Sequence, residues 1–249
     1  MTARLIINAD DFGYEPNVTR GIFEAMTAGV VNSTTLVVNA PNSAEGGALI
    51  RANPLAAGLH FNLARFAPCS RAPLTSLDSR GEFDERRVSS MSVADVASEL
   101  EAQLHRFEVL TGKRPTHIDV HKHLHTHRNV LEGMAGPARD FTLPVRSINT
   151  EMRTALGALG VRTNDVFLGD AGSEPYWTLE RFLAQLAALP ESGVAELMCH
   201  PGYALRDFPS GYSKQREVEL ATLVDPRAKT SLADARVELV TWAAVREER

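Results

Sequence analysis

The chain of 249 residues contains only two cysteines, Cys69 and Cys199, which lie far apart in the sequence. Two distant cysteines exclude the disulfide framework that stabilises small secreted domains. No apolar run approaches the roughly 18 residues that a membrane-spanning helix requires, and no apolar segment with a cleavage site opens the chain. These absences predict a cytoplasmic protein without a membrane span.

Clustered positive charge is also missing. Lys and Arg number 26 against 31 Asp and Glu, which gives a formal net charge of −5, and no basic stripe runs along the sequence. Nucleic acid is therefore not expected as a partner, because binding to phosphates depends on clustered positive charge. No G-x-G-x-x-G follows the first apolar segment, which disfavours dinucleotide binding. The oligomeric state stays open, a homo-oligomer included.

Short apolar segments alternate with amphipathic ones along most of the chain. Strands are predicted at 4–9, 31–39, 56–63, 116–123, 144–149, 164–170 and 194–202, and helices at about 16–28, 43–52, 93–110, 128–140, 178–189, 213–223 and 230–235, with 236–245 as a last strand or helix. This β-then-α order favours parallel strands with right-handed crossovers. We predict an α/β fold, a TIM-like, somewhat irregular (β/α) barrel with parallel strands. It forms a single domain over residues 1–249, with a long loop at about 64–90.

Histidine is concentrated in one short segment. Five of the eight histidines lie in HIDVHKHLHTH, residues 117–127, each at an odd position. Side chains alternate between the faces of a strand, so these imidazoles are predicted to share one face. Same-face neighbours lie roughly 6.6–6.8 Å apart, whereas a metal ion binds nitrogen at about 2.0–2.1 Å. Only one or two of these histidines can therefore bind one cation directly.

Further polar side chains lie at or near the carboxyl ends of predicted strands. They are Asp10, Asp11, His60, Asn62, Asp119, Arg146, Asp165, Asp170 and His200. In a (β/α) barrel these strand ends form the active site. Carboxylates combined with imidazoles suit Zn²⁺ and are also used with Mn²⁺, Co²⁺ or Mg²⁺. The sequence therefore predicts one divalent metal ion, with Zn or Mg preferred and Mn or Co as alternatives.

The adjacent carboxylates of Asp10 and Asp11 raise an energetic question, because two like charges held close in a dry site oppose each other's ionisation. A cation bound by one carboxylate relieves the repulsion, and the other carboxylate then stays available as a base beside a bound water. The cation lowers the pKa of that water and polarises a carbonyl group. With His200 placed to protonate a leaving amine, the combination suits hydrolysis of an amide.

Four ordered motifs carry a resemblance to a known family: NADDFG, GLHFNL, THIDVHKHLH and ELMCHPGY, with APLTSLDSRGEF and TNDVFLGD between them. Over most of residues 4–212 they resemble the YdjC/ChbG-like carbohydrate deacetylases, which are related to the NodB-like polysaccharide deacetylases. The resemblance implies a TIM-like barrel and metal-dependent removal of an acetyl group from N-acetylated sugars such as chitooligosaccharides. Ala64, Arg65 and Phe66 depart from the family pattern, and the last forty residues match it poorly and receive no role.

Matched motif by motif, the resemblance implies roles for individual residues. The metal ligands are Asp11, His60 and His121, the general base is Asp10, the general acid is His200, and Arg146 orients or charge-balances Asp10. The predicted substrate contacts are Asn62, His123 and His125, where the two histidines also fit positions behind the metal ligands.

Two other functions stay open at this point. One is a metal-dependent amidohydrolase or phosphoesterase, although such enzymes usually carry His-x-His on the first strand, where this chain has Asp10 and Asp11. The other is a non-catalytic sugar-binding homologue, which would have no use for a separate base and acid.

Overall fold

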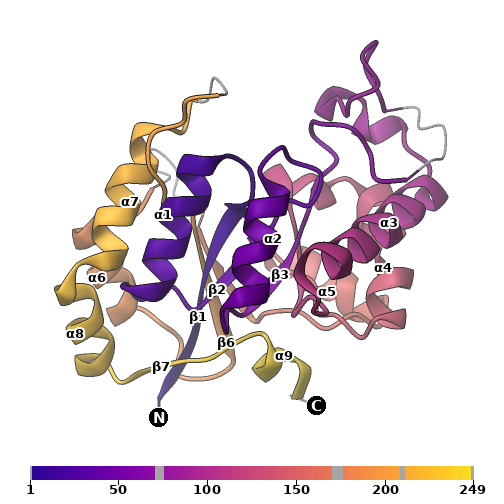
Figure 1. Cartoon of the computed structure of the whole chain (residues 1–249). Helices are drawn as coiled ribbons and strands as arrows, with labels where there is room; N and C mark the ends of the chain where they lie inside the picture. The colour runs from indigo at the N-terminus through magenta and orange to yellow at the C-terminus, as the bar shows by residue number, and fades with distance from the viewer. Residues whose placement is uncertain (1, 71–75, 170–175, 208–210, 248–249) are drawn as a thin grey trace.

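Parallel strands form a sheet that curls into a half-barrel with helices packed around it (Figure 1). The computed structural model describes residues 2–70, 76–169, 176–207 and 211–247. The strand order is β4-β3-β2-β1-β6-β5, and a short β7 pairs with β1. The strands are β1 Ala3–Phe12, β2 Ser33–Leu36, β3 Ala57–Phe61, β4 Ile118–Val120, β5 Val166–Leu168, β6 Val194–Cys199 and β7 Val237–Leu239. The predicted irregular (β/α) barrel is confirmed.

Helices connect most of these strands. They are α1 Pro16–Thr27, α2 Ser43–Ala52, α3 Val93–Thr111, α4 Arg128–Asp140, α5 Thr150–Ala158, α6 Leu179–Ala187, α7 Lys214–Val224, α8 Pro226–Asp234 and α9 Ala243–Glu247, with two 3₁₀ helices, η1 Glu85–Ser90 and η2 His121–Thr126. Local sequence explains their ends. In α3, Ser92 and Asp95 form a reciprocal capping box, and Gly112 ends the helix in the left-handed conformation. No helix in the described ranges is long and apolar enough to cross a membrane.

Strand β1 is the centre of the sheet and positions the candidate site. It pairs in parallel with β2 on one side and β6 on the other. Leu5, Ile6 and Ile7 are completely buried, which is the pattern expected of a strand covered on both faces. Because β1 continues to Phe12, Asp10 and Asp11 are among its last three residues and lie at the carboxyl edge of the sheet.

Three sequence predictions of secondary structure are wrong or incomplete. The strand predicted at 116–123 ends at Val120, because Lys122 and His123 adopt φ angles of 56° and 53° and start the 3₁₀ turn η2. The strand predicted at 144–149 is reduced to one bridge between Val145 and Ile118, and the N–H of Ser147 donates to the Asn164 side chain instead of to a neighbouring strand. Helix α5 follows it and was not predicted.

The loop predicted at 64–90 contains the helix η1 and an antiparallel bridge between Leu77 and Phe83; its residues 71–75 lie outside the described ranges. The segment 236–245 contains both alternatives, because β7 is followed by α9. Trp242, directly before α9, is fully buried against Ile6 and Val194, so the segment from β7 to α9 covers one face of the sheet's first residues.

Candidate metal centre and active site

A β-bulge brings the two adjacent aspartates to the same place. On a regular strand Asp10 and Asp11 would point to opposite faces. The register of β1 shifts between Ala9 and Phe12, and Asp11 has a φ of 74°, in the left-handed region. Such a bulge changes the direction of a side chain, and here both carboxylates line one cavity of about 590 Å³. The cavity is lined by Asp10, Asp11, Tyr14, His60, Arg65, His121, Lys122, His123, Met198, His200, Gly211, Tyr212 and Arg216.

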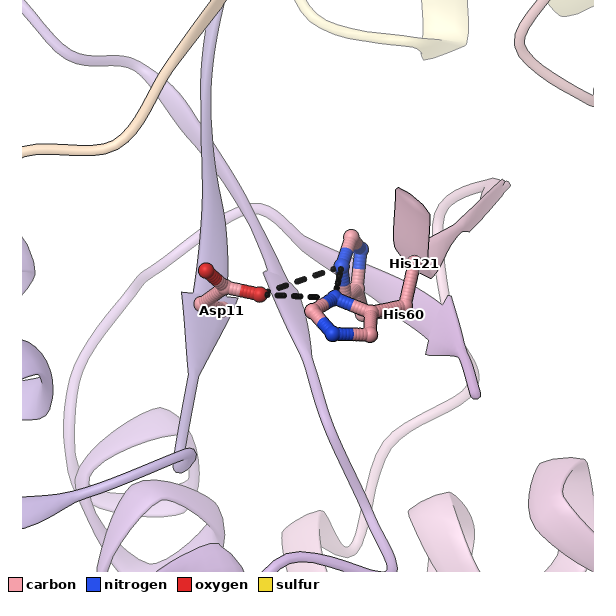
Figure 2. A group of neighbouring side chains, drawn as sticks. All are labelled: Asp11, His60 and His121. Carbon is pink, nitrogen blue, oxygen red and sulfur yellow. Dashed lines mark hydrogen bonds and ion pairs between the residues drawn. The ribbon is translucent and has the colours of Figure 1, made fainter. Parts of the chain in front are cut away.

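Three of the lining side chains present ligand atoms to one point (Figure 2). Asp11 Oδ1 lies 3.2 Å from His60 Nε2 and 3.1 Å from His121 Nδ1, and the two nitrogens are 3.1 Å apart. If each ligand atom lies about 2.0–2.1 Å from a cation, two ligand atoms are about 2.9 Å apart at octahedral angles and about 3.4 Å apart at tetrahedral angles. The three atoms therefore have the spacing of one face of a metal coordination shell.

The second nitrogen of His60 is held by a buried carboxylate. His60 Nδ1 lies 2.7 Å from Asp119 Oδ1, and the other oxygen of Asp119 accepts a hydrogen bond from Thr35 at 2.9 Å. This arrangement places the proton of a neutral His60 on Nδ1 and leaves Nε2 free to bind a cation. Burial lowers the pKa of His60, but Asp119 and Asp11 raise it to about 10, so the site attracts positive charge at this imidazole.

Arg146 holds the other aspartate. It is completely buried, and its two terminal nitrogens donate to the two oxygens of Asp10 at 2.6 and 2.8 Å. The same guanidinium contacts Glu196 at 2.6 Å and Asp119 at 3.0 Å. Burial raises the pKa of the Asp10 carboxyl, but Arg146 outweighs it and holds that pKa far below its usual value. Asp10 therefore stays ionised.

Asp11 has an arginine of its own. Arg216 on α7 donates from Nη2 to Asp11 Oδ2 at 2.5 Å, whereas Oδ1 faces the two histidines. Burial again opposes ionisation, but Arg216 and His121 keep the pKa of Asp11 well below the ordinary range. The repulsion between the adjacent carboxylates is thus offset by two buried arginines, one for each aspartate.

His200 follows β6 and lines the cavity from the other side. Burial lowers its pKa to about 4, although Asp10 and Asp11 act in the opposite direction, so this imidazole is neutral near pH 7. Its ring packs against Tyr212, 5.4 Å between centroids. Behind both residues, Glu219 on α7 accepts hydrogen bonds from the His200 backbone N–H and from the Tyr212 hydroxyl. Glu219 thereby fixes two parts of the cavity wall.

The three predicted substrate contacts lie in different surroundings. His123 lines the cavity and packs edge-on against Phe167, 5.6 Å between centroids. His125 is buried behind it, bonds through Nε2 to the Arg146 carbonyl at 3.1 Å, and lines a separate cavity. Asn62 is fully buried and bonds to the Arg65 carbonyl and the Ala64 N–H, so it shapes a turn. Of the three, His123 lines the cavity that contains Asp11, His60 and His121.

The prediction of a shared histidine face is wrong. His117 precedes β4 and stacks on Trp242 at 4.3 Å, where burial keeps its pKa well below the usual value. His121 and His123 belong to η2, whose turn ends the alternation of a strand. Asp165 precedes β5 and accepts from the Val194 N–H at 2.7 Å, so it lies at the opposite strand end. Asp170 lies outside the described residues.

Sequence reasoning missed three charged residues around the site: Glu196, Arg216 and Glu219. The available signal was weak. Glu196 is a charge inside the buried strand β6, and Arg216 and Glu219 are three residues apart, so they share a helix face. A charge within an apolar strand requires a partner, but the sequence does not show which residue it contacts.

Comparisons with known proteins identify the family. The profile of the family described as YdjC-like protein matches residues 4–234. The chain belongs to the YdjC-like family. It is 37% identical to a carbohydrate deacetylase of Geobacillus stearothermophilus over 95% of this chain and 96% of the relative. It is 35% identical to a chitooligosaccharide deacetylase of Klebsiella pneumoniae over 97% and 98%.

Among solved structures, this YdjC-like protein is similar to a crystal structure from Enterococcus faecalis V583. The TM-score is 0.87 and the sequence identity 30%, with 98% of this chain and 99% of the other covered. The family resemblance read from the motifs is therefore confirmed.

Proposed function

We propose that this YdjC-like protein is a divalent-metal-dependent hydrolase that removes an N-acetyl group from an amino sugar, in a chitooligosaccharide or a glycoconjugate. The names of the two relatives support deacetylation of a sugar. The observation that carries the proposal is the triad of Asp11, His60 and His121, with Asp10 and His200 lining the same cavity.

The residues present fit a divalent cation. Two imidazole nitrogens and a carboxylate oxygen are ligands that Zn²⁺ accepts and that other divalent ions also use. The cation would be held by Asp11 Oδ1, His60 Nε2 and His121 Nδ1. When bound, it would supply Lewis acidity toward a carbonyl oxygen and toward water.

Asp10 and His200 share the proton transfers. Asp10 is kept ionised by Arg146 and is the group that accepts a proton from the attacking water. Its low pKa means that it does not retain this proton. His200 is neutral at pH 7, so it can take up the proton and donate it to the leaving nitrogen. The products are an acetate ion and the amine in its ammonium form, so both protons of the consumed water end on the nitrogen.

A two-metal phosphoesterase is less well supported. A second group of ligand atoms exists, formed by Asp10, His60 and Asp119. However, Arg146 already contacts Asp10 and Asp119 at 2.6 and 3.0 Å, so a guanidinium occupies the position that a second cation would need. The site therefore suits one metal ion.

The test is acetate release from N-acetylglucosamine oligomers and a panel of other acetylated sugars. We expect release that EDTA abolishes and that Zn²⁺, Mg²⁺, Mn²⁺ or Co²⁺ restores, and none from His60→Ala. A panel of phosphodiesters serves as the second arm. Hydrolysis of a phosphodiester without acetate release from any sugar, or sugar binding without turnover, would reject the proposal.

A further inference from the structure

Arg216 contacts the metal triad from outside the motifs that carry the family resemblance. It lies on α7, in the segment that sequence reasoning left without a role, and only 5% of it is exposed. Nη2 donates to Asp11 Oδ2 at 2.5 Å, and Nε donates to the Tyr212 carbonyl at 3.2 Å. Its backbone carbonyl accepts from the Gly202 N–H at 3.1 Å, which joins α7 to the segment after His200. Two hydrogen bonds thus hold the guanidinium, and a third contact holds the backbone of Arg216.

One nitrogen of this guanidinium has no partner. Nη1 is buried, and no hydrogen-bond acceptor for it exists among the described residues. A buried donor of a charged group without an acceptor is costly and uncommon in folded proteins. Because Arg216 lines the cavity that holds Asp10, Asp11 and His200, the missing acceptor is expected to be part of a ligand in that cavity.

The other cations near the cavity are engaged. Arg146 is surrounded by Asp10, Asp119 and Glu196, and Lys122 pairs with Glu85 of η1. Arg65 donates to the Tyr14 hydroxyl at 2.5 Å. Among the described residues that line the cavity, Arg216 is therefore the cation with a buried hydrogen-bond donor that has no acceptor.

We propose that Arg216 is a catalytic residue that binds the acyl oxygen of the substrate through Nη1. This inference rests on the proposed deacetylation. As the water oxygen bonds to the acyl carbon, the electron pair of the carbonyl double bond moves to its oxygen, and the guanidinium donates a hydrogen bond to the resulting negative charge. When the carbon–nitrogen bond breaks, the pair returns to the carbonyl and the leaving nitrogen takes a proton. At the same time Nη2 keeps Asp11 Oδ2 occupied, so Asp11 offers only Oδ1 to a cation.

The experiment compares the wild type with Arg216→Gln and Arg216→Lys, using the full chain. Arg227→Gln is the matched control, because Arg227 also pairs with an aspartate, Asp225, but is exposed on α8. Zinc stoichiometry and the affinity of the zinc-loaded protein for acetate are measured by calorimetry. Initial rates of acetate release give kcat and KM.

We expect Arg216→Gln to bind about one zinc per chain, to bind acetate at least about tenfold more weakly, and to lose about 10²-fold or more in kcat with little change in KM. Arg216→Lys keeps the charge but not the two-nitrogen geometry, so it should recover less than a tenth of the lost rate. The control should match the wild type in all measurements.

Distinct results would overturn different parts. If excess zinc returns kcat of Arg216→Gln to within twofold of the wild type, Arg216 acts only through Asp11 and the acyl-oxygen role is wrong. Unchanged acetate affinity and kcat in both variants would also reject it. A wild type that takes up no divalent metal would instead reject the proposed function itself.

A measurement on the wild type avoids the risk that a variant fails to fold. Crystals of the zinc-loaded protein soaked in acetate should show an acetate oxygen within hydrogen-bond distance of Arg216 Nη1. Acetate bound in the cavity without that contact would contradict the inference.

Discussion

At the scale of single residues, the site is organised around one carboxylate–arginine pair for each aspartate. Asp10 is paired with Arg146 and Asp11 with Arg216. Both carboxyls are therefore ionised before any metal ion binds, although each is almost completely buried. The sequence suggested that a bound cation offsets their repulsion, whereas the two guanidinium groups already do so. The protein thus holds two ionised carboxylates side by side, as the proposed roles of metal ligand and general base require.

Replacement of Asp10 distinguishes the proposed general base from the proposed metal ligand. Asp10→Asn should lower kcat by about 10²–10⁴-fold, the usual contribution of a general base, and leave metal content near the wild-type value, because Asp11, His60 and His121 are unchanged. Metal analysis and acetate release on the same preparation check this. Loss of the metal together with the activity would reverse the assignment of the two aspartates.

Asp119→Asn should instead weaken metal binding. Asp119 fixes His60 through a 2.7 Å contact, and loss of such a partner typically weakens metal affinity or activity about 10–100-fold. The dissociation constant for zinc, measured by calorimetry with Asp10→Asn as the comparison, tests this. Equal zinc affinity in the wild type and Asp119→Asn would show that Asp119 does not position His60.

Glu196 should make stability depend on pH. Burial raises its pKa to about 7 even though Arg146 acts against the shift, so between its ordinary value of 4.5 and pH 7 the folded protein holds a proton that the unfolded chain releases. Stability therefore falls as pH rises through this range, by up to about 1.4 kcal/mol per pH unit. Urea unfolding from pH 5 to 7 should show a flatter pH dependence for Glu196→Gln than for the wild type. Parallel curves would contradict this.

At the scale of elements, close helix packing supports the strand ends. Helices α3 and α4 precede and follow the segment of β4 and η2 that carries the histidines. They approach closely at Gly133, where an added Cβ would lie 2.6 Å from Val96 Cβ and 2.8 Å from the Val93 carbonyl oxygen. A side chain at this position has no space, so α3 and α4 are in direct contact at Gly133.

Gly133→Ala should destabilise the protein by about 1–3 kcal/mol, the usual cost of overpacking. Gly157 in α5 is the control, because a Cβ there meets nothing within 4 Å. Gly157→Ala should be neutral or stabilise by up to about 1 kcal/mol through helix propensity. Urea denaturation of both variants measures the difference, and equal stabilities would argue against close α3–α4 packing.

At the scale of the whole molecule, the three proposed metal ligands come from three distant parts of the chain. Asp11 ends β1, His60 lies in β3 and His121 begins η2, so they form a site only in the folded protein. A metal ion that binds only the folded state stabilises it by mass action. Unfolding should therefore depend on metal concentration.

Zinc at about 100 times its dissociation constant should add about 2.7 kcal/mol to the free energy of unfolding. His60→Ala should lose this increment, since it removes one ligand of three. Thermal or chemical unfolding with and without zinc tests both proteins. A wild type whose stability does not respond to zinc, magnesium, manganese or cobalt would contradict the metal centre.

The sequence by itself determined the fold class and the chemical character of the site. Apolar segments long enough for buried strands alternate with amphipathic helices, and this periodicity is local information that survives without tertiary contacts. The adjacent aspartates and the separated histidines were also evident, because parallel strands place their carboxyl ends at one edge.

Only the tertiary structure decided which side chains meet. The bulge at Asp11 and the left-handed turn at Lys122 change side-chain directions, so strand alternation does not hold for Asp11, His121 and His123. Arg216 and Glu219 reach the site through the packing of α7, and Arg216 is 205 residues from Asp11 in the sequence. The partner of a buried charge depends on long-range packing, and local sequence patterns do not carry that information.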